Sequence, residues 1–263
     1  MLKGLYTAYS GMVNEQNRMD VLTNNLANSA TTGYKAEGAT SQTFDAMLAY
    51  RIKDEQDGYA GGVYLGRNNP GVKIGETYTD YSQGSFRETG NRYDIALSGE
   101  GFFTIEYTNR AGETSTMYTR DGAFTLTKEG YLVTKDGDFV LGRGANGELG
   151  HIQIDPTHDA SIDTSGKIVQ NNQVIATLQI TDFEDYNFLE HYGENFYQPV
   201  EGAEIVESSA KVQSGYLEAS NVQVVREMVE LISVTRQYES NQKILQAYDE
   251  TLQISVNELG KLY

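Results

Sequence analysis

The side chains of this sequence best suited to metal chemistry are three histidines, and they lie far apart. His151, His158 and His191 lack the short spacing that places two ligands on one face of an element. The segment 136–138, Asp-Gly-Asp, is similar to the start of a calcium loop, but the frame of about 12 residues and its closing glutamate are missing. A hairpin turn is the simpler interpretation. We expect no bound metal and no cofactor.

Catalytic chemistry is equally poorly supported. With 37 acidic residues, some pair of carboxylates will approach by chance, so their number says nothing about hydrolysis. The sequence has no serine nucleophile elbow and no lysine in a phosphate loop. Gly99-Glu100-Gly101 is typical of a bulge or a strand entry, because no helix pattern follows it. We therefore predict that the protein is not an enzyme and takes no small-molecule substrate.

Composition narrows the class of protein further. The 263 residues include 20 Lys and Arg against 37 Asp and Glu, a formal charge of -17, which disfavours nucleic acid because phosphates are bound by basic side chains. There is no cysteine, so disulfides and thiolate metal sites are excluded. No apolar run reaches the roughly 18–20 residues of a membrane-spanning helix, and the first residues do not resemble a cleaved signal peptide. These properties indicate a globular chain that folds by packing alone.

Near the amino terminus an apolar residue recurs every seven positions, which predicts a helix with one apolar stripe. The pattern ends at the turn-forming cluster from Asn28 to Gly33. Asn24, Asn25 and Asn28 fit helix termination, although their side chains could also bond across a subunit contact. The stripe consists of Leu5, Met12, Met19 and Leu26, with Ala8 and Leu22 between them.

The carboxy-terminal pattern is longer and predicts a helix of about 40 residues, or about 60 Å. Ser220 and Gln223 have the spacing of a capping box at its start, and Gly260 marks its expected end. Polar residues in the second seam would weaken the pairing but select its register. The first seam reads Val224, Leu231, Tyr238, Leu245, Leu252 and Leu259, and the second Met228, Thr235, Gln242, Asp249 and Val256.

The sequence between these helices is β-like. Residues 35–80 show weak periodicity and predict an extended, irregular connector. Beyond them, strand-like runs such as Phe102–Ile105 alternate with turn pairs such as Asp136-Gly137 at intervals of about 8–12 residues, which is typical of an antiparallel domain. The predicted fold class is α+β, with long N- and C-terminal helices that pair as a coiled coil and an inserted antiparallel all-β domain. The expected parts are an N-terminal assembly helix (1–34), an extended connector (35–80), a β-rich outer domain (81–206), and a return segment with the C-terminal assembly helix (207–263).

Four separated blocks carry a resemblance that covers nearly the whole chain. They are Asn24–Asn28 continued by Gly33, Tyr34 and Lys35; Gly99–Phe103; Tyr118–Phe124; and Leu217–Val222. In this order they resemble the flagellar basal-body rod and hook protein family. Within it, the long segment before Gly84 and the block Tyr192–Tyr197 resemble the distal-rod member, and the proximal-rod member shares most of the motifs.

The resemblance implies a structural rod subunit that leaves the cytoplasm through the flagellar type III export apparatus and lies in the cell envelope. It implies helical polymerisation through the terminal helices into the drive shaft that turns the hook. The implied partners are copies of the chain, other rod and hook subunits, the export apparatus and a bushing ring. Family members carry an export recognition element formed by Phe, three residues and an aliphatic residue. Phe44 and Leu48 have this spacing, although core packing would equally explain them.

The apolar stripes are the predicted assembly interface. An isolated amphipathic helix is marginal in water, so we expect the ends to be loosely ordered in the monomer and to order when neighbours cover them. From the pattern alone, an ordinary two-helix core is equally compatible. The predicted interface residues are Leu5, Met12, Met19, Leu22, Leu26, Val224, Met228, Leu231, Tyr238, Leu245, Leu252, Val256 and Leu259.

Two other classes of function stay open at this point. A secreted binding module or adhesin would use the β-domain for recognition and the helices as an anchor. A carboxylate-based hydrolase would depend on one pair of acidic residues. The 19 tyrosines fit either contact patches or cross-strand pairs within the sheet.

Overall fold

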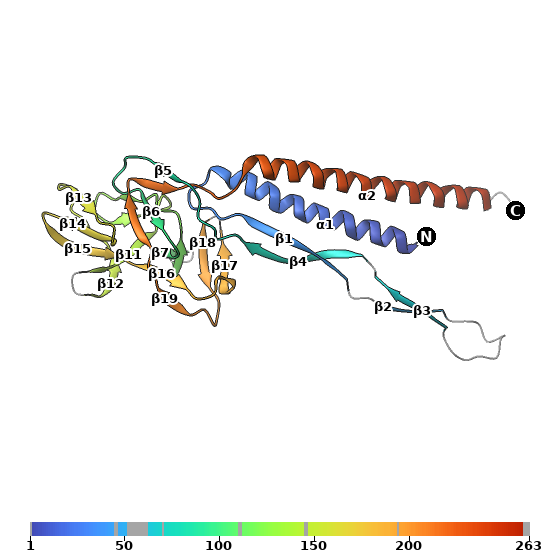
Figure 1. The fold of residues 1–263 in the computed structure, drawn as a ribbon, viewed down its shortest axis with the longest axis horizontal. Helices are drawn as coiled ribbons and strands as arrows, with labels where there is room; N and C mark the ends of the chain where they lie inside the picture. Colours follow the sequence, from blue (N-terminus) through green and yellow to red (C-terminus); the bar gives the residue numbers. More distant parts are fainter. Residues whose placement is uncertain are drawn as a thin grey trace. The chain divides into compact units, whose positions relative to one another are not determined.

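The computed structural model describes residues 2–44, 47–51, 63–69, 71–109, 112–144, 147–193 and 195–259 (Figure 1). The architecture is α+β, with a helix at each end of the chain and a large antiparallel β domain, as the sequence predicted. The chain divides into two compact units. Unit 1 consists of Met1–Leu26, Glu37–Thr79 and Gln223–Tyr263, and unit 2 of Ala27–Ala36 and Asp80–Val222.

Unit 1 contains the helices α1 (Leu2–Ala27) and α2 (Val224–Leu259), which run antiparallel to each other. Gly4 lies against Tyr248, Gly11 against Asn241, and Asn25 bonds to Glu227. Moving seven or fourteen residues forward along α1 therefore corresponds to moving the same number of residues backward along α2. The two helices keep one register across these three contacts. Neither helix, over the residues described, carries an apolar stretch of the length that crossing a bilayer requires.

The start of α2 differs from the predicted capping box. The hydroxyl of Ser220 accepts a hydrogen bond from the Val222 backbone N–H at 3.2 Å, before the helix begins at Val224. Ser220 therefore closes a turn that leads into α2 and does not cap it. Glu227 lies in the first helical turn, where a carboxylate complements the helix dipole. The expected end at Gly260 lies outside the described residues.

The segment 35–80 also differs from the prediction of an irregular connector. It contains β1 (Glu37–Thr43) paired with β4 (Val72–Thr79), and β2 (Met47–Arg51) paired with β3 (Val63–Asn68), both antiparallel. These strands lack the clear alternation of apolar and polar residues that marks a half-buried strand, so sequence periodicity did not find them. Both strand pairs belong to unit 1.

Unit 2 is an antiparallel β structure around an apolar core. Its main sheet has the order β13-β14-β15-β11-β7-β8-β18-β17. Ile95, Phe103 and Leu132 are fully buried in the core. The turn between β14 and β15 places Asn171 and Asn172 at positive φ, a conformation that asparagine adopts more readily than most residues. The strands are β5 (Phe86–Glu88), β6 (Ile95–Ser98), β7 (Phe102–Thr108), β8 (Thr114–Thr119), β9 (Thr125–Leu126), β10 (Leu132–Val133), β11 (Phe139–Gly144), β12 (Leu149–His151), β13 (Ala160–Ile162), β14 (Lys167–Gln170), β15 (Gln173–Leu178), β16 (Ile180–Phe183), β17 (Leu189–Tyr192), β18 (Phe196–Pro199), β19 (Ile205–Glu207), β20 (Lys211–Ser214) and β21 (Tyr216–Glu218).

Candidate assembly surface and polar junction

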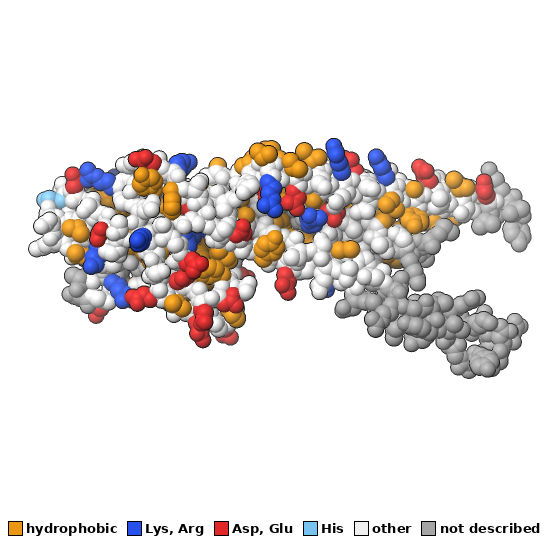
Figure 2. All heavy atoms as spheres, in the orientation of Figure 1, with side chains coloured by type: hydrophobic (Ala, Val, Ile, Leu, Met, Phe, Trp, Pro, Cys, Tyr) orange, Lys and Arg blue, Asp and Glu red, His pale blue; other side chains and the backbone are white. Residues whose placement is uncertain are grey.

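The first half of α2 exposes an apolar stripe, which we call the α2 outer face and define as Val225, Met228, Val229 and Ile232. These side chains are 76%, 46%, 63% and 53% exposed. Their spacing of three, four and seven places them on one side of the helix. Figure 2 shows the apolar side chains gathered over the start of α2. An apolar stripe this exposed is typical of a contact surface for another chain.

The predicted heptad residues lie mostly on the opposite side of α2 and along α1. Leu22 is buried, and Met228 and Val256 are exposed. The side chain of Leu259 lies outside the described residues. The half-buried members are Leu5, Met12, Met19, Leu26, Val224, Leu231, Tyr238, Leu245 and Leu252.

The second seam of α2 is offset by one residue from the predicted positions. Glu227, Val234 and Asn241 are turned inward, whereas Met228 is exposed. Asn241 fits because Gly11 presents no side chain: a Cβ there would lie 3.1 Å from the Asn241 Nδ2 atom. The contacts of Glu227 with Asn25 and of Asn241 with Gly11 fit this register, and Met228, which it turns outward, forms part of the outer face.

A second apolar surface lies in unit 1, between α1 and β4. This groove has a volume of about 400 Å³ and is lined by residues that include Tyr6, Tyr9, Phe44 and Val72. The Phe44 ring is exposed, and the Lys73 ammonium lies 5.8 Å from its centroid. Of the predicted export element, Phe44 is accessible, and Leu48 lies in β2 with its side chain outside the described residues.

The signature residue Asn25 ties α1 to the strand that follows. Its side chain accepts from the Glu37 backbone N–H at 2.9 Å and donates to the Glu37 carbonyl at 2.8 Å. It also donates to Glu227 of α2 at 3.3 Å. At the 3-10 turn that follows α1, the side-chain oxygen of Asn28 accepts from the Thr31 hydroxyl. Helix termination therefore describes Asn28, whereas Asn25 is buried and holds three segments of unit 1 together.

In unit 2, the backbone of Gly33 has a left-handed conformation that glycine adopts more readily than other residues. Its φ is +70°, and a Cβ would lie 2.5 Å from the backbone carbon of Arg120. The Gly33 N–H donates to the Glu218 carbonyl at 2.8 Å. The next residue, Tyr34, is fully buried and packs edge-on against His191. Gly33 therefore allows the amino-terminal signature to lie directly against the later blocks.

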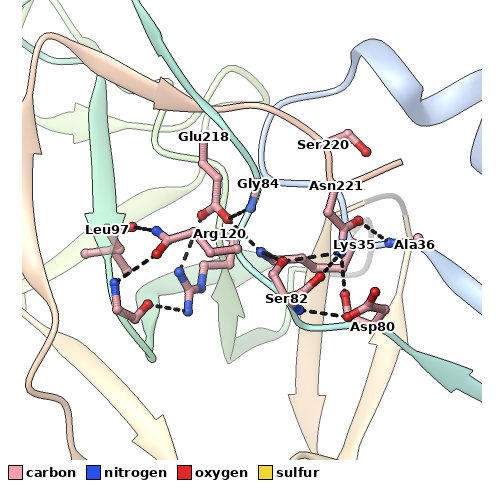
Figure 3. Close-up of polar contacts among 12 residues, drawn as sticks. Lys35, Ala36, Asp80, Ser82, Gly84, Leu97, Arg120, Glu218, Ser220 and Asn221 are labelled. Atoms are coloured by element: carbon pink, nitrogen blue, oxygen red, sulfur yellow. Dashed lines mark hydrogen bonds and ion pairs between the residues drawn. The ribbon is translucent and has the colours of Figure 1, made fainter. Parts of the chain in front are cut away.

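The polar junction, which we define as Lys35, Arg120, Glu218 and Asn221, lies in unit 2 (Figure 3). The Lys35 ammonium donates to Glu218 at 2.6 Å and to the Ser82 carbonyl at 2.9 Å. Both side chains are buried, so burial lowers the pKa of Lys35 even though Glu218 lies beside it. Removing one partner of such a buried ion pair strongly destabilises the fold, because the other charge stays buried without compensation.

Arg120 completes the buried network. Its guanidinium contacts the second oxygen of Glu218 at 3.4 Å and donates to the Gly99 carbonyl at 2.9 Å (Figure 3). It also lies 5.3 Å from the centroid of the Phe102 ring. Glu218 accepts a further bond from the Gly84 N–H. Three of the blocks that carry the family resemblance therefore meet at one carboxylate.

Asn221 forms hydrogen bonds with residues at the positions where the chain enters and leaves unit 2. Its side-chain oxygen accepts from the Ala36 N–H at 2.8 Å, and its amide donates to the Asp80 carbonyl at 2.7 Å (Figure 3). The chain crosses from one unit to the other after residues 26, 36, 79 and 222. The Asn221 side chain therefore joins, within unit 2, the chain segments at three of these four crossings. Sequence reasoning named Lys35 but gave no role to Arg120, Glu218 or Asn221, although all three stand in the resembling blocks.

Three protein-family models match this sequence. Residues 5–35 match the flagella basal body rod protein family, residues 96–170 the D1 domain of flagellar hook protein FlgE/F/G, and residues 213–259 the C-terminal region of flagellar basal body rod FlgEFG proteins. Flagellar basal-body rod protein FlgG of Bacillus subtilis (strain 168) is 34% identical over 286 residues, covering 98% of this chain and 99% of that protein. Flagellar basal-body rod protein FlgF of Caulobacter vibrioides (strain ATCC 19089 / CIP 103742 / CB 15) is 32% identical over 271 residues and covers both chains fully. Flagellar basal-body rod protein FlgG of Agrobacterium fabrum (strain C58 / ATCC 33970) is 32% identical, covering 96% of this chain.

Proposed function

Because this chain belongs to the flagellar basal-body rod protein family, we propose that it polymerises helically through its terminal helices to form the shaft that turns the hook. Proteins of this family are structural components of the basal body and assemble with other rod and hook subunits. The observation that carries the proposal is the exposed α2 outer face on the antiparallel pair of α1 and α2.

The energetics favour coverage of this face by neighbouring chains. Fully burying one exposed Val, Ile or Met side chain contributes roughly 1.5–3 kcal/mol, so the four partly exposed side chains offer at most roughly 6–12 kcal/mol gross. Part of this gain offsets the entropy lost on association. We propose that each copy presents this stripe to a different surface of the next copy, through a rotation that does not close a ring, so that repeating the contact gives a helical filament.

The pairing of α1 with α2 as a coiled coil is part of the same proposal. The matched steps of seven residues and the glycines opposite Tyr248 and Asn241 support it. We place the half-buried heptad residues inside this pair and the outer face between subunits. The export step is also a proposal: Phe44, which is accessible, and Leu48, four residues later, have the spacing of the family element and would be read by the type III export apparatus.

Within the family, we assign the chain to the distal rod, and the proximal rod or a hook-type role is the alternative. Relatives named FlgG and FlgF match nearly the full length at similar identity, 34% and 32%, so identity alone does not separate them. Electron microscopy of basal bodies carrying a tagged copy of this chain would place the tag along the rod and decide between them.

The assembly proposal is tested by charging the outer face. Val229→Lys should abolish motility and leave basal bodies without a complete rod, while the variant protein is still exported. The matched control is Val174→Lys in β15, where the valine is 47% exposed on unit 2, and it should assemble normally. Normal rods built from the Val229→Lys variant would refute the proposal. If the variant is no longer exported, its loss of motility would reflect failed export and not failed assembly.

A further inference from the structure

Besides the α2 outer face, unit 1 exposes the groove between α1 and β4, to which the assembly proposal gives no partner. Tyr6 and Tyr9 line this groove and are 63% and 54% exposed, and Phe44, which also lines it, is 37% exposed. Contiguous exposed apolar surfaces mark places where another chain binds. The groove is therefore a second candidate contact surface of unit 1.

The groove lies on the side of α1 that faces away from α2. Gly4 and Gly11 are α1 residues that pack against α2. Tyr6 lies two positions after Gly4, whereas Tyr9 lies two positions before Gly11. Two positions correspond to a rotation of about 200° around a helix, so these tyrosines point away from α2. In Figure 1, α1 runs between α2 and the pair of β1 and β4.

The α2 outer face lies on the side of α2 that faces away from α1. Glu227 bonds to α1, and Val234 is buried. Val225 and Val229 lie two positions before and after Glu227. Ile232 lies two positions before Val234. The same rotation of about 200° directs these side chains away from α1, so unit 1 has apolar surfaces on two opposite sides of its helix pair.

Two apolar surfaces on opposite sides of one unit cannot cover each other within a single chain. They cover each other between copies stacked in the same sense, because the outer face of one copy then meets the groove of the next. Such a contact joins two different surfaces, so each added copy leaves one outer face and one groove open. A contact of outer face with outer face would instead close a pair and leave both grooves exposed.

We propose that the α2 outer face of one copy packs into the groove between α1 and β4 of the next copy. The inference rests on the proposed function and names the surface that receives the outer face. The outer face presents a ridge of aliphatic side chains, and the groove presents aromatic rings, which dominate the energetics of protein interfaces. Arg236 lies on α2 beside Val229 and Ile232, and its guanidinium would pack against the exposed tyrosine rings of the groove.

Disulfide cross-linking tests the contact, and the chain suits this method because it contains no cysteine. A variant with both Tyr9→Cys and Val229→Cys is expressed beside the parent chain, so that rods form, and the purified basal bodies are oxidised. We expect cross-linked dimers and higher multimers of the variant, resolved by gel electrophoresis. A disulfide within one chain is excluded because the two positions lie on opposite sides of the helix pair.

Three control variants make the result specific. Tyr9→Cys alone and Val229→Cys alone should give no cross-linked dimer, and neither should Tyr9→Cys combined with Val174→Cys on unit 2. Dimers from Val229→Cys alone would mean that the outer face pairs with itself and would overturn the proposal. A double variant that stays without cross-links in complete rods, or that joins only to a different protein, would overturn it as well.

A pair of opposite charges gives a second test in cells. Val229→Lys is expected to block rod assembly, and adding Tyr9→Glu places an anion opposite the new cation in the next copy. This addition should raise the number of rods per cell at least about tenfold over Val229→Lys alone. The matched control adds Tyr78→Glu, because Tyr78 is 57% exposed in β4 and does not line the groove. No restoration by Tyr9→Glu, or equal restoration by Tyr78→Glu, would contradict the pairing.

Failure of this inference is distinguishable from failure of the proposed function. Normal rods built from Val229→Lys alone would refute both, because the outer face would then have no part in assembly. Complete rods in which the double cysteine variant gives no cross-link would refute only the pairing of the outer face with the groove.

Discussion

Lys35 and Glu218 lie 183 positions apart in the sequence, yet their Nζ and Oε1 atoms are 2.6 Å apart in the interior of unit 2. The pair joins the segment that follows α1 to the strand that leads into α2. Arg120 and the Gly84 N–H complete the coordination of the carboxylate. An early and a late segment of unit 2 are thus joined at a single buried charge.

Removing one partner of this pair should destabilise the protein strongly. Lys35→Met keeps the length of the side chain but leaves Glu218 buried without its closest cation. We expect the free energy of unfolding to fall by about 3–5 kcal/mol, measured by urea denaturation. The matched control is Arg18→Met, because Arg18 and Glu230 form a half-exposed ion pair at 3.1 Å. This variant should lower the free energy of unfolding by less than about 1 kcal/mol. Equal losses in the two variants would show that burial is not the cause.

Gly33 should be irreplaceable by alanine for two separable reasons. A left-handed backbone costs an L-residue about 1–2 kcal/mol, and the added Cβ would also press on the Arg120 backbone. Gly90 has nearly the same φ, +71°, but a Cβ there meets nothing within 4 Å. Gly90→Ala should therefore lower the stability of the protein only by the backbone cost, whereas Gly33→Ala should lower it clearly more. Similar melting temperatures for the two variants would count against the close approach.

Asp138 should make stability depend on pH. Burial raises the pKa of its carboxyl above the ordinary 3.8, and the nearby Asp136 adds to the rise. The folded state then binds the proton more tightly than the unfolded state, so the stability from Asp138 is full below pH 3.8 and is lost as pH rises through the raised value. Relative to the parent, Asp138→Asn should thus gain stability between pH 3 and pH 7. Urea denaturation at both pH values checks this, and a difference that does not change with pH would contradict it.

Truncation should separate the two units at the boundaries of the structure. Deleting residues 1–26 removes α1 up to the start of unit 2, and should leave the β unit folded while preventing rod assembly. Deleting residues 1–34 also removes Tyr34, which is 1% exposed in unit 2, and should lower the unfolding temperature of that unit. Calorimetry of the two truncated chains makes the comparison. Identical transitions would show that residues 27–34 do not stabilise unit 2.

Helix content should rise on assembly. The outer face of α2 is exposed in the single chain, and an amphipathic helix with an uncovered stripe is marginal in water. Circular dichroism of the dilute monomer should show clearly less helix than the assembled form, with an unchanged β signal. Equal helicity in both states would mean that the ends are already stable alone.

The sequence by itself determined the features that depend on neighbouring residues. The repeat of seven predicted both helices, and the pairs of turn residues predicted an antiparallel domain, because periodicity and turn chemistry act over a few positions. The blocks around Asn25, Arg120 and Glu218 sufficed to identify the family. The sequence did not reveal strands β1 to β4, whose residues alternate too weakly.

Only the tertiary structure decided which residues meet across long separations. The inward seam of α2 runs through Glu227 and Asn241, which lie opposite Asn25 and Gly11 of α1, and Met228 is turned outward. The junction of Lys35, Arg120 and Glu218 forms because three distant segments converge on one buried carboxylate. No local pattern encodes these choices, since the free energy of a buried polar contact depends on which partner the fold brings within bonding distance.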